Sequence, residues 1–182
     1  MSERAVADLR RSPGPLARLS DAADRVTVAL AATCLIAMLV IVMLQVVARY
    51  IFDAPPAWTE EGARYMMVWS GLLGAAVAFK RRLDPVLFQW RPEGPNWLLK
   101  AMTLLQSVAV LGFIVPVLYT CFVGPGGDPA RSFMARQMKV TADTFGFSMV
   151  WVASAVPLMG LLILLHLFGG RAPMADDEPA ID

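Results

Sequence analysis

Long apolar stretches alternate with short polar segments along this chain. Four stretches contain no Asp, Glu, Lys or Arg: residues 26–48, 65–79, 101–123 and 144–168. A helix that crosses the ~30 Å hydrocarbon core of a bilayer needs about 20 mostly apolar residues at ~1.5 Å of rise each. Three stretches are long enough, and the second needs its flanking residues. We therefore predict an all-α membrane protein with four transmembrane helices, at 26–48, 60–79, 101–123 and 144–168.

Composition agrees with a membrane location and narrows the partners. Of 182 residues, 57% are apolar and 17% are charged, whereas soluble domains average roughly 45–50% and about 25%. The formal net charge is +1 and no basic stripe is present, so we expect membrane lipid and no nucleic acid as a partner. We divide the chain into a cytoplasmic or interfacial segment (1–25), a transmembrane domain (26–168) and an acidic cytoplasmic tail (169–182).

Lysine and arginine residues are distributed unevenly between the two sides of the predicted bundle. Eleven fall on the side of the termini and five fall in the other two loops. Because cytoplasmic loops are enriched in Lys and Arg, both termini are predicted to be cytoplasmic. The inner cations are Arg4, Arg10, Arg11, Arg18, Arg25, Lys80, Arg81, Arg82, Arg91, Lys100 and Arg171. The outer cations are Arg49, Arg64, Arg131, Arg136 and Lys139.

The second apolar stretch reaches the length of a span only when it begins near Glu60 and includes Glu61 and Arg64. An ionised side chain at mid-membrane costs about 2.5–3.5 kcal/mol and less near the interface, so these charges belong at a membrane surface. The proline-rich segment 53–58 is too short for anything but a tight turn. The first two spans are therefore predicted to form a helical hairpin with a charged outer tip.

Polar and aromatic side chains collect at this tip. Gln45 and Arg49 are four residues apart, as are Glu60 and Arg64, so each pair shares a helix face. The two cations and two acids at the tip are expected to neutralise each other. The set permits two interpretations, a ring of headgroup anchors or a docking surface for a partner protein. Its members are Gln45, Arg49, Trp58, Glu60, Glu61, Arg64 and Trp69.

Small residues recur at helical spacing in the second span. Gly71 with Ala75, and Gly74 with Ala78, form pairs four residues apart that let another helix approach closely. That helix could belong to the same bundle or to another subunit, and the sequence leaves both possibilities open.

Other features concern the membrane surfaces and the shapes of the helices. Residues 85–90 are apolar but too few to cross, so they are predicted to lie in the inner interface. Residues 15–25 are predicted to form a short helix that leads into the first span. Pro116 and Pro157 are each predicted to kink a helix. His166, near the inner end of the last span, is predicted to be an interfacial polar anchor.

The chain offers few groups for membrane chemistry. A single histidine excludes haem ligation by paired histidines. We identify no Ser/His/Asp set, and neither a Cys/His cluster at metal spacing nor a Gly-rich phosphate loop occurs. Ion and proton relays need ionisable groups inside spans, whereas these spans contain mainly amides and hydroxyls such as Gln45 and Gln106. We therefore expect no catalytic residue, cofactor or metal, and no ability to carry a substrate alone.

The tip residues also carry a resemblance to a known family. The stretches concerned are QVVARYIF at 45–52, WTEEGAR at 58–64, a tryptophan at 69 and LGAA at 73–76. They resemble the pattern Q-V-x-x-R-Y-x-F, W-x-E-E-x-A-R, W and L-G-A-A of the DctQ-type small membrane subunit of tripartite ATP-independent periplasmic (TRAP) transporters. A looser similarity follows at 145–151 and 157–160, and the resemblance covers about residues 25–168.

The resemblance implies a division of labour in the bacterial inner membrane. A soluble periplasmic protein captures an organic acid, and a large polytopic subunit carries the substrate and sodium sites. The small subunit, with four spans and a cytoplasmic N-terminus, packs on the static scaffold of the large subunit and is not an enzyme. If the charged tip residues have the roles of the matching family residues, they would organise the outer hairpin at that interface and shape a transient docking surface for the binding protein. These residues are Arg49, Glu60, Glu61 and Arg64.

Two further residues, Gly74 and Ala75, would pack helices closely. One departure from the family pattern concerns the segment after the second span, where the family usually has basic residues followed by a histidine. Here Lys80, Arg81 and Arg82 are followed by no histidine, so the resemblance assigns no role to the loop 80–100.

Two alternatives stay open beside the TRAP interpretation. One is the small subunit of a tripartite tricarboxylate transporter, which also has four spans but which the W-x-E-E-x-A-R block argues against. The other is a free-standing four-helix membrane protein, either a regulatory partner or an enzyme, and the missing ligands disfavour the enzyme.

Overall fold

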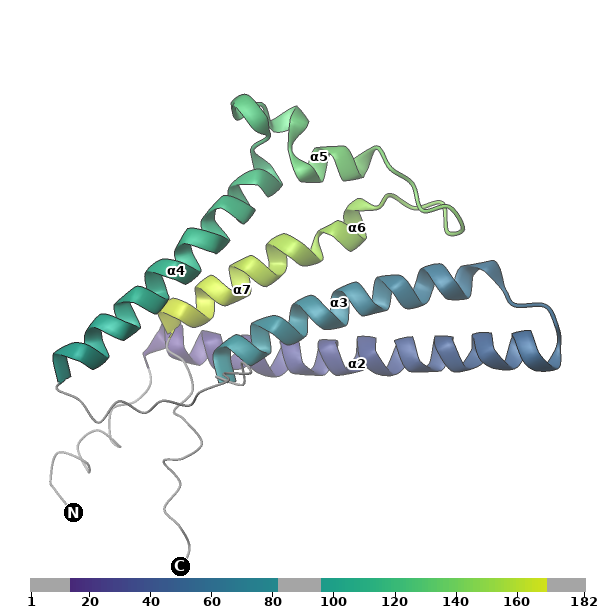
Figure 1. Cartoon of the computed structure of the whole chain (residues 1–182), viewed down its shortest axis with the longest axis horizontal. Helices are drawn as coiled ribbons and strands as arrows, with labels where there is room; N and C mark the ends of the chain where they lie inside the picture. The colour runs from purple at the N-terminus through teal and green to yellow at the C-terminus, as the bar shows by residue number, and fades with distance from the viewer. Residues whose placement is uncertain (1–13, 82–95, 170–182) are drawn as a thin grey trace, which may run out of the picture.

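The computed structural model describes residues 14–81 and 96–169 (Figure 1). Within these residues the backbone is helical apart from turns and one isolated β-bridge, so the predicted all-α class is confirmed for the described chain. The long helices are α2 (Pro15–Ile51), α3 (Ala57–Arg81), α4 (Asn96–Phe122) and α7 (Ala155–Gly169). The short ones are the 3-10 turns η1 (Pro125–Gly127) and η2 (Pro129–Arg131), and the helices α5 (Phe133–Met138) and α6 (Val150–Ala153).

Three stretches of the described chain are long and apolar enough to cross a membrane. They are Pro15–Ile51, Leu104–Phe122 and Val150–Gly169. The remaining long helix, α3, has the length of a span at 25 residues but carries Glu60 in its first turn and Lys80 and Arg81 in its last turn. Four crossings and cytoplasmic termini therefore stay predictions.

Helices α2 and α3 form the predicted hairpin and lie side by side in opposite directions (Figure 1). The connection is a tight turn, as expected. Asp53 adopts a left-handed backbone conformation with φ of 50°, and the Ala54 N–H donates to the Ala48 carbonyl at 3.2 Å. The Thr59 N–H then donates to the Pro56 carbonyl at 3.2 Å, so Trp58 lies in the first turn of α3 rather than in the loop.

The face of α2 that turns toward its neighbours follows a regular spacing of alternately four and three residues. Such a spacing matches a left-handed, coiled-coil-like crossing of two helices. The residues on this face are at least partly buried, whereas most of the others in α2 are exposed. The face is polar near the start of the helix and mostly apolar beyond it. Its residues are Ser20, Asp24, Thr27, Ala31, Cys34, Met38, Ile41, Gln45 and Ala48.

Helix α2 also corrects one expectation from the sequence. Residues 15–25 are not a separate short helix, because α2 runs unbroken from Pro15 to Ile51. No glycine or proline interrupts residues 16–54, and the inward-facing stripe starts with Ser20 and Asp24, which are buried. The tertiary contacts of this segment therefore hold it in line with the span.

Helix α7 is the central packing element for the rest of the bundle. It contacts α2, α3 and α4, whereas α4 packs on the other long helices chiefly through α7 (Figure 1). The apolar core joins Ala76 of α3, Ile114 of α4 and Met159 and Ile163 of α7. Gly160 provides the closest approach of α4 to α7, because a Cβ placed there would lie 3.0 Å from Leu118 Cδ2.

The last predicted span, 144–168, becomes helical later in the chain than its apolar sequence suggested. Residues 144–149 form turns, and helix starts at Val150 as α6. The helical pattern is interrupted at Ser154 before α7 begins at Ala155. Pro157 explains the interruption, since proline supplies no N–H for the Ala153 carbonyl four residues earlier and its ring crowds that carbonyl. By contrast, α4 continues through Pro116.

The long helices alternate in direction, so the start of α2 and the end of α7 lie at the same end of the bundle (Figure 1). They are in contact there, as a Cβ on Gly169 would lie 2.6 Å from the Cβ of Ser20. This arrangement is compatible with termini on one side of a membrane. The predictions for residues 85–90 and for the tail after residue 169 lie outside the described residues.

The close approach at Gly160 predicts a stability effect. We expect Gly160→Leu to lower the free energy of unfolding by about 1–3 kcal/mol, because the new side chain must displace Leu118 and separate α4 from α7. Thermal unfolding of the full chain in detergent measures this effect.

Gly112→Leu on α4 is the matched control. A Cβ at Gly112 meets no atom within 4 Å, so the same substitution there has space and should leave the unfolding temperature unchanged or slightly raised. Equal destabilisation by the two substitutions would contradict the proposed role of Gly160.

Candidate functional site

The outer end of the bundle is held together by the Glu61 carboxylate. Its Oε1 accepts a hydrogen bond from the Asp143 N–H at 3.1 Å, and its Oε2 accepts one from the Thr144 N–H at 2.8 Å. The Tyr65 hydroxyl, one helical turn along α3, also donates to Oε1. A single side chain of the hairpin therefore fixes a turn that lies more than 80 residues away in sequence.

Tyr65 gives this anchor an aromatic base. Its side chain is buried, and its ring centroid lies 6.2 Å from that of Phe145 and 5.7 Å from that of Phe147. Its hydroxyl also lies 3.2 Å from Met149 Sδ. Tyr65, Ala142 and Val152 are the buried residues of a second apolar cluster at the outer end, against which Phe147 and Met149 pack.

The anchored turn is a small hairpin of extended backbone over residues 140–149. The Ala142 N–H donates to the Phe147 carbonyl at 2.8 Å, and the Met149 N–H donates to the Val140 carbonyl at 2.8 Å. Gly146 allows the reversal, because its φ of 68° is a conformation that other residues rarely adopt. We call this segment the outer turn.

The other charged residues of the tip behave differently from Glu61. Glu60 and Arg64 form an ion pair at 3.0 Å with both side chains well exposed. Arg49 is exposed and has no hydrogen bond or ion pair within the described chain. The expected mutual neutralisation of two cations and two acids is therefore wrong for Arg49 and Glu61, because Glu61 binds backbone N–H groups instead.

The three remaining tip residues do not converge on one point. Trp58 is exposed on the first turn of α3. Gln45 is partly buried on the inward face of α2, and Trp69 is partly buried on α3. The structure thus brings together Glu61 and the outer turn, and leaves Arg49, Trp58, Glu60 and Arg64 on the surface.

Sequence reasoning missed Tyr65 and the outer turn. The spacing of four residues between Glu61 and Tyr65 was a usable signal for contact on one helix face. The outer turn had no comparable signal, because residues 144–149 belong to an uncharged stretch that was predicted to be helical.

The small-residue face of α3 is open. A Cβ at Gly71 or Gly74 would meet no atom within 4 Å, and Ala75 is exposed. Packing among the helices of residues 14–81 and 96–169 therefore does not account for Gly71 and Gly74, although the sequence allowed it. We call Gly71, Gly74, Ala75 and Ala78 the open face of α3.

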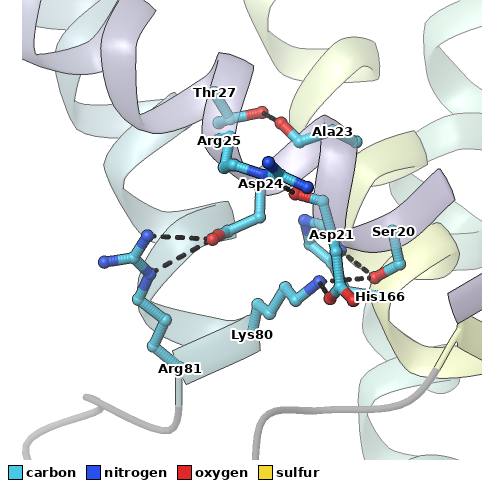
Figure 2. Close-up of polar contacts among 9 residues, drawn as sticks. All are labelled: Ser20, Asp21, Ala23, Asp24, Arg25, Thr27, Lys80, Arg81 and His166. Atoms are coloured by element: carbon cyan, nitrogen blue, oxygen red, sulfur yellow. Dashed lines mark hydrogen bonds and ion pairs between the residues drawn. The ribbon is translucent and has the colours of Figure 1, made fainter. Parts of the chain in front are cut away.

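The inner end of the bundle holds a cluster of polar residues from three helices (Figure 2). Lys80 of α3 donates to Ser20 Oγ at 2.9 Å and forms an ion pair with Asp21 at 2.6 Å. Arg81 pairs with Asp24 at 2.9 Å. The residues of this inner cluster are Ser20, Asp21, Asp24, Lys80, Arg81 and His166.

His166 lies inside this cluster rather than at a lipid or solvent surface. It is fully buried, and its Nδ1 lies 2.9 Å from Ser20 Oγ. The predicted role of interfacial anchor is therefore wrong, because the ring points into the bundle and finds its partner there. Two buried atoms of the cluster, His166 Nε2 and Asp24 Oδ1, have no hydrogen-bond partner.

The inner cluster balances its own charge. Two acids face two cations, and the Lys80 side chain is only 5% exposed, so the ion pair and the hydrogen bond offset its desolvation. Within the described residues, no group of three or more His, Cys, Asp or Glu side chains is placed to hold a metal ion.

Comparison with known families decides the identity. Residues 38–171 match the family model described as "Tripartite ATP-independent periplasmic transporters, DctQ component". The chain belongs to this family. The match includes Glu61, Tyr65, the outer turn and His166, and it begins after Ser20, Asp21 and Asp24.

One curated relative is similar over most of this DctQ chain. It is the "Sialic acid TRAP transporter permease protein SiaT" of Haemophilus influenzae (strain 86-028NP), and it is 26% identical over 137 residues. The alignment covers 75% of this chain and 21% of the relative. The chain thus spans about a fifth of the length of that relative. The membership makes it a multi-pass membrane component of a TRAP transporter.

The Glu61 anchor predicts a local effect on the outer turn. We expect Glu61→Ala to raise the amide exchange rate of residues 140–149 by about 10–100-fold, because two backbone N–H groups lose a charged acceptor. Hydrogen exchange of the full chain in detergent, followed by mass spectrometry of the peptide, measures this change.

The adjacent acid supplies the control. Glu60 pairs only with Arg64 at the surface, where ion pairs contribute little, so Glu60→Ala should leave exchange in the outer turn within about twofold of the wild type. Similar exchange in the two variants would mean that Glu61 does not hold the turn.

Proposed function

We propose that this chain is the non-catalytic small membrane subunit of a TRAP secondary transporter and that it holds the large, substrate-carrying subunit in the bilayer. The observation that carries this proposal is the open face of α3. Gly71 and Gly74 leave space that no described residue of this chain fills. Membrane helices use such small residues to bring two backbones close together, so a helix of the large subunit is the expected occupant.

The position of the open face supports a helix as the occupant. It lies on α3, and the helix paired with α3, α2, also exposes many apolar side chains. In lipid, apolar surface alone gives no preference for protein over acyl chains, and close packing at small residues provides it. Gly74 and Ala75, which the family pattern carries, are therefore the proposed contact residues, together with Gly71 and Ala78.

The distribution of charge supports placing transport itself in other chains. The ion pairs of the described chain lie near the ends of the long helices, in the inner cluster, at the outer tip and in the turns after α4. A route for an ion or a carboxylate across the membrane needs ionisable or otherwise polar groups along the spans. We place the substrate and sodium sites in the large subunit, and an organic acid is the proposed substrate class.

The exposed tip residues form the proposed docking surface for the periplasmic binding protein. Arg49, Trp58, Glu60 and Arg64 remain accessible on the outer end, beside the outer turn. This assignment requires four spans, cytoplasmic termini and a location in the bacterial inner membrane, all of which we include in the proposal. The DctQ match decides against the tripartite tricarboxylate alternative.

The open face makes the proposal testable. We expect the double variant Gly71→Leu/Gly74→Leu to lose the large subunit during purification, with recovery about tenfold or more below that of the wild type, because bulky side chains block the close helix approach. The full chain, affinity-tagged and co-expressed with the large subunit, would be purified in a mild detergent and the subunit ratio quantified.

Gly112→Leu serves as the matched control, since it places the same side chain in open space on α4 and should not change the subunit ratio. Wild-type recovery by the double variant would show that the open face is not the interface. A wild-type chain that elutes alone in several detergents would overturn the scaffold function itself.

A further inference from the structure

The inner cluster contains a chain of hydrogen bonds that links three helices through one hydroxyl. Lys80 Nζ lies 2.9 Å from Ser20 Oγ, and Ser20 Oγ lies 2.9 Å from His166 Nδ1 (Figure 2). Ser20 and His166 are fully buried, and Lys80 is nearly so. Ser20 thus stands between the cation of α3 and the imidazole of α7.

The approach of α7 to Ser20 depends on a glycine. A Cβ on Gly169 would lie 2.6 Å from Ser20 Cβ and 3.1 Å from the Leu16 carbonyl oxygen, distances that other residues do not tolerate. The last turn of α7 therefore rests directly on α2, which brings His166 within hydrogen-bonding distance of Ser20.

The chemistry of the ammonium, hydroxyl and imidazole groups determines which atom donates in each of the two hydrogen bonds. An ammonium group only donates hydrogen bonds, so Ser20 Oγ accepts from Lys80. Ser20 has a single hydroxyl proton, and His166 Nδ1 is the one acceptor among its two partners. If Ser20 donates to Nδ1, the ring proton is on Nε2, and one buried donor is unsatisfied. If Nδ1 donated instead, the Ser20 proton and the Nε2 lone pair would both lack a partner.

We infer that Lys80, Ser20 and His166 form a directional latch that closes the inner end of the bundle and requires a neutral His166 with its proton on Nε2. The latch ties α7 to the α2–α3 hairpin beside the two ion pairs that join α2 to α3. It goes beyond the scaffold function and does not depend on the identity of the large subunit. The family match begins at residue 38, so Ser20 lies outside it.

The charges around His166 favour the neutral ring. On α2, Asp21 pairs with Lys80 and Asp24 pairs with Arg81 of α3, so the two acids are already matched by two cations. A proton on Nδ1 would add a fifth charge close to the Lys80 ammonium and would turn the acceptor of the Ser20 hydrogen bond into a donor. A protonated ring would therefore open the latch.

The protonation state can be measured directly, because His166 is the sole histidine of the 182-residue chain. The full chain would carry a tag without histidine and ¹⁵N-labelled histidine in nanodiscs. We expect an unprotonated, pyridine-like Nδ1 and a protonated, pyrrole-like Nε2 from pH 6 to 8. A proton on Nδ1 at pH 7.5 would overturn the inference, and this measurement needs no substitution.

Two variants of His166 separate the latch from simple packing. Asn places an acceptor oxygen near the position of Nδ1, so His166→Asn should retain the link to Ser20. His166→Leu has no acceptor and should raise the amide exchange of the inner end of α7 by about tenfold. Ser20→Ala should give the same increase in the exchange of α7, and adding it to His166→Leu should have little further effect there, because both variants remove the same hydrogen bond between α2 and α7.

The outcomes of the exchange experiment are distinct. Equal exchange in His166→Asn and His166→Leu would overturn the latch, as would additive effects of Ser20→Ala and His166→Leu. Failure of the large subunit to co-purify with the wild-type chain would bear on the scaffold function alone.

Discussion

Polar groups placed in a membrane helix bundle must find partners within the protein, and here most of the described polar contacts between helices lie at the two ends of the long helices. At the inner end, three helices share a balanced set of ion pairs and hydrogen bonds around Lys80 and His166. At the outer end, the Glu61 carboxylate ties α3 to the outer turn. Between the ends the described helices pack through apolar residues such as Ala76, Ile114 and Met159. The ends therefore set the relative positions of α2, α3 and α7.

Local sequence patterns were sufficient to predict much of the fold. The uncharged stretches located the long helices, and the prolines at 55 and 56 located the turn of the hairpin, because both signals act within a few residues of their effect. The late start of helix at Val150 could not be predicted from such local signals. Residues 144–149 are as uncharged as a span, and the outer turn owes its shape to Gly146 and to a carboxylate more than 80 positions earlier.

For the candidate sites too, the sequence identified local features but not the distant contacts. Glu61 was identified from its position at the tip, but its partners were not, since backbone N–H groups leave no trace in a residue pattern. His166 was assigned to the membrane interface because its hydrogen-bond partner, Ser20, is separated from it by 146 positions. The open face of α3 was recognised as a packing surface from its spacing, and only the three-dimensional arrangement showed that no helix of the described chain covers it.

The length of α2 has a consequence for how the subunit sits in the bilayer. With 37 residues, α2 is about 55 Å long, whereas hydrocarbon and headgroups together measure about 40–45 Å. Its uncharged part, residues 26–48, is about 34 Å long, which is enough to cross a ~30 Å core with some tilt. In the proposed topology, the first three turns would project beyond the acyl chains. The inner cluster would then lie at headgroup depth, where the local thickness of the membrane would decide how much water reaches its ion pairs.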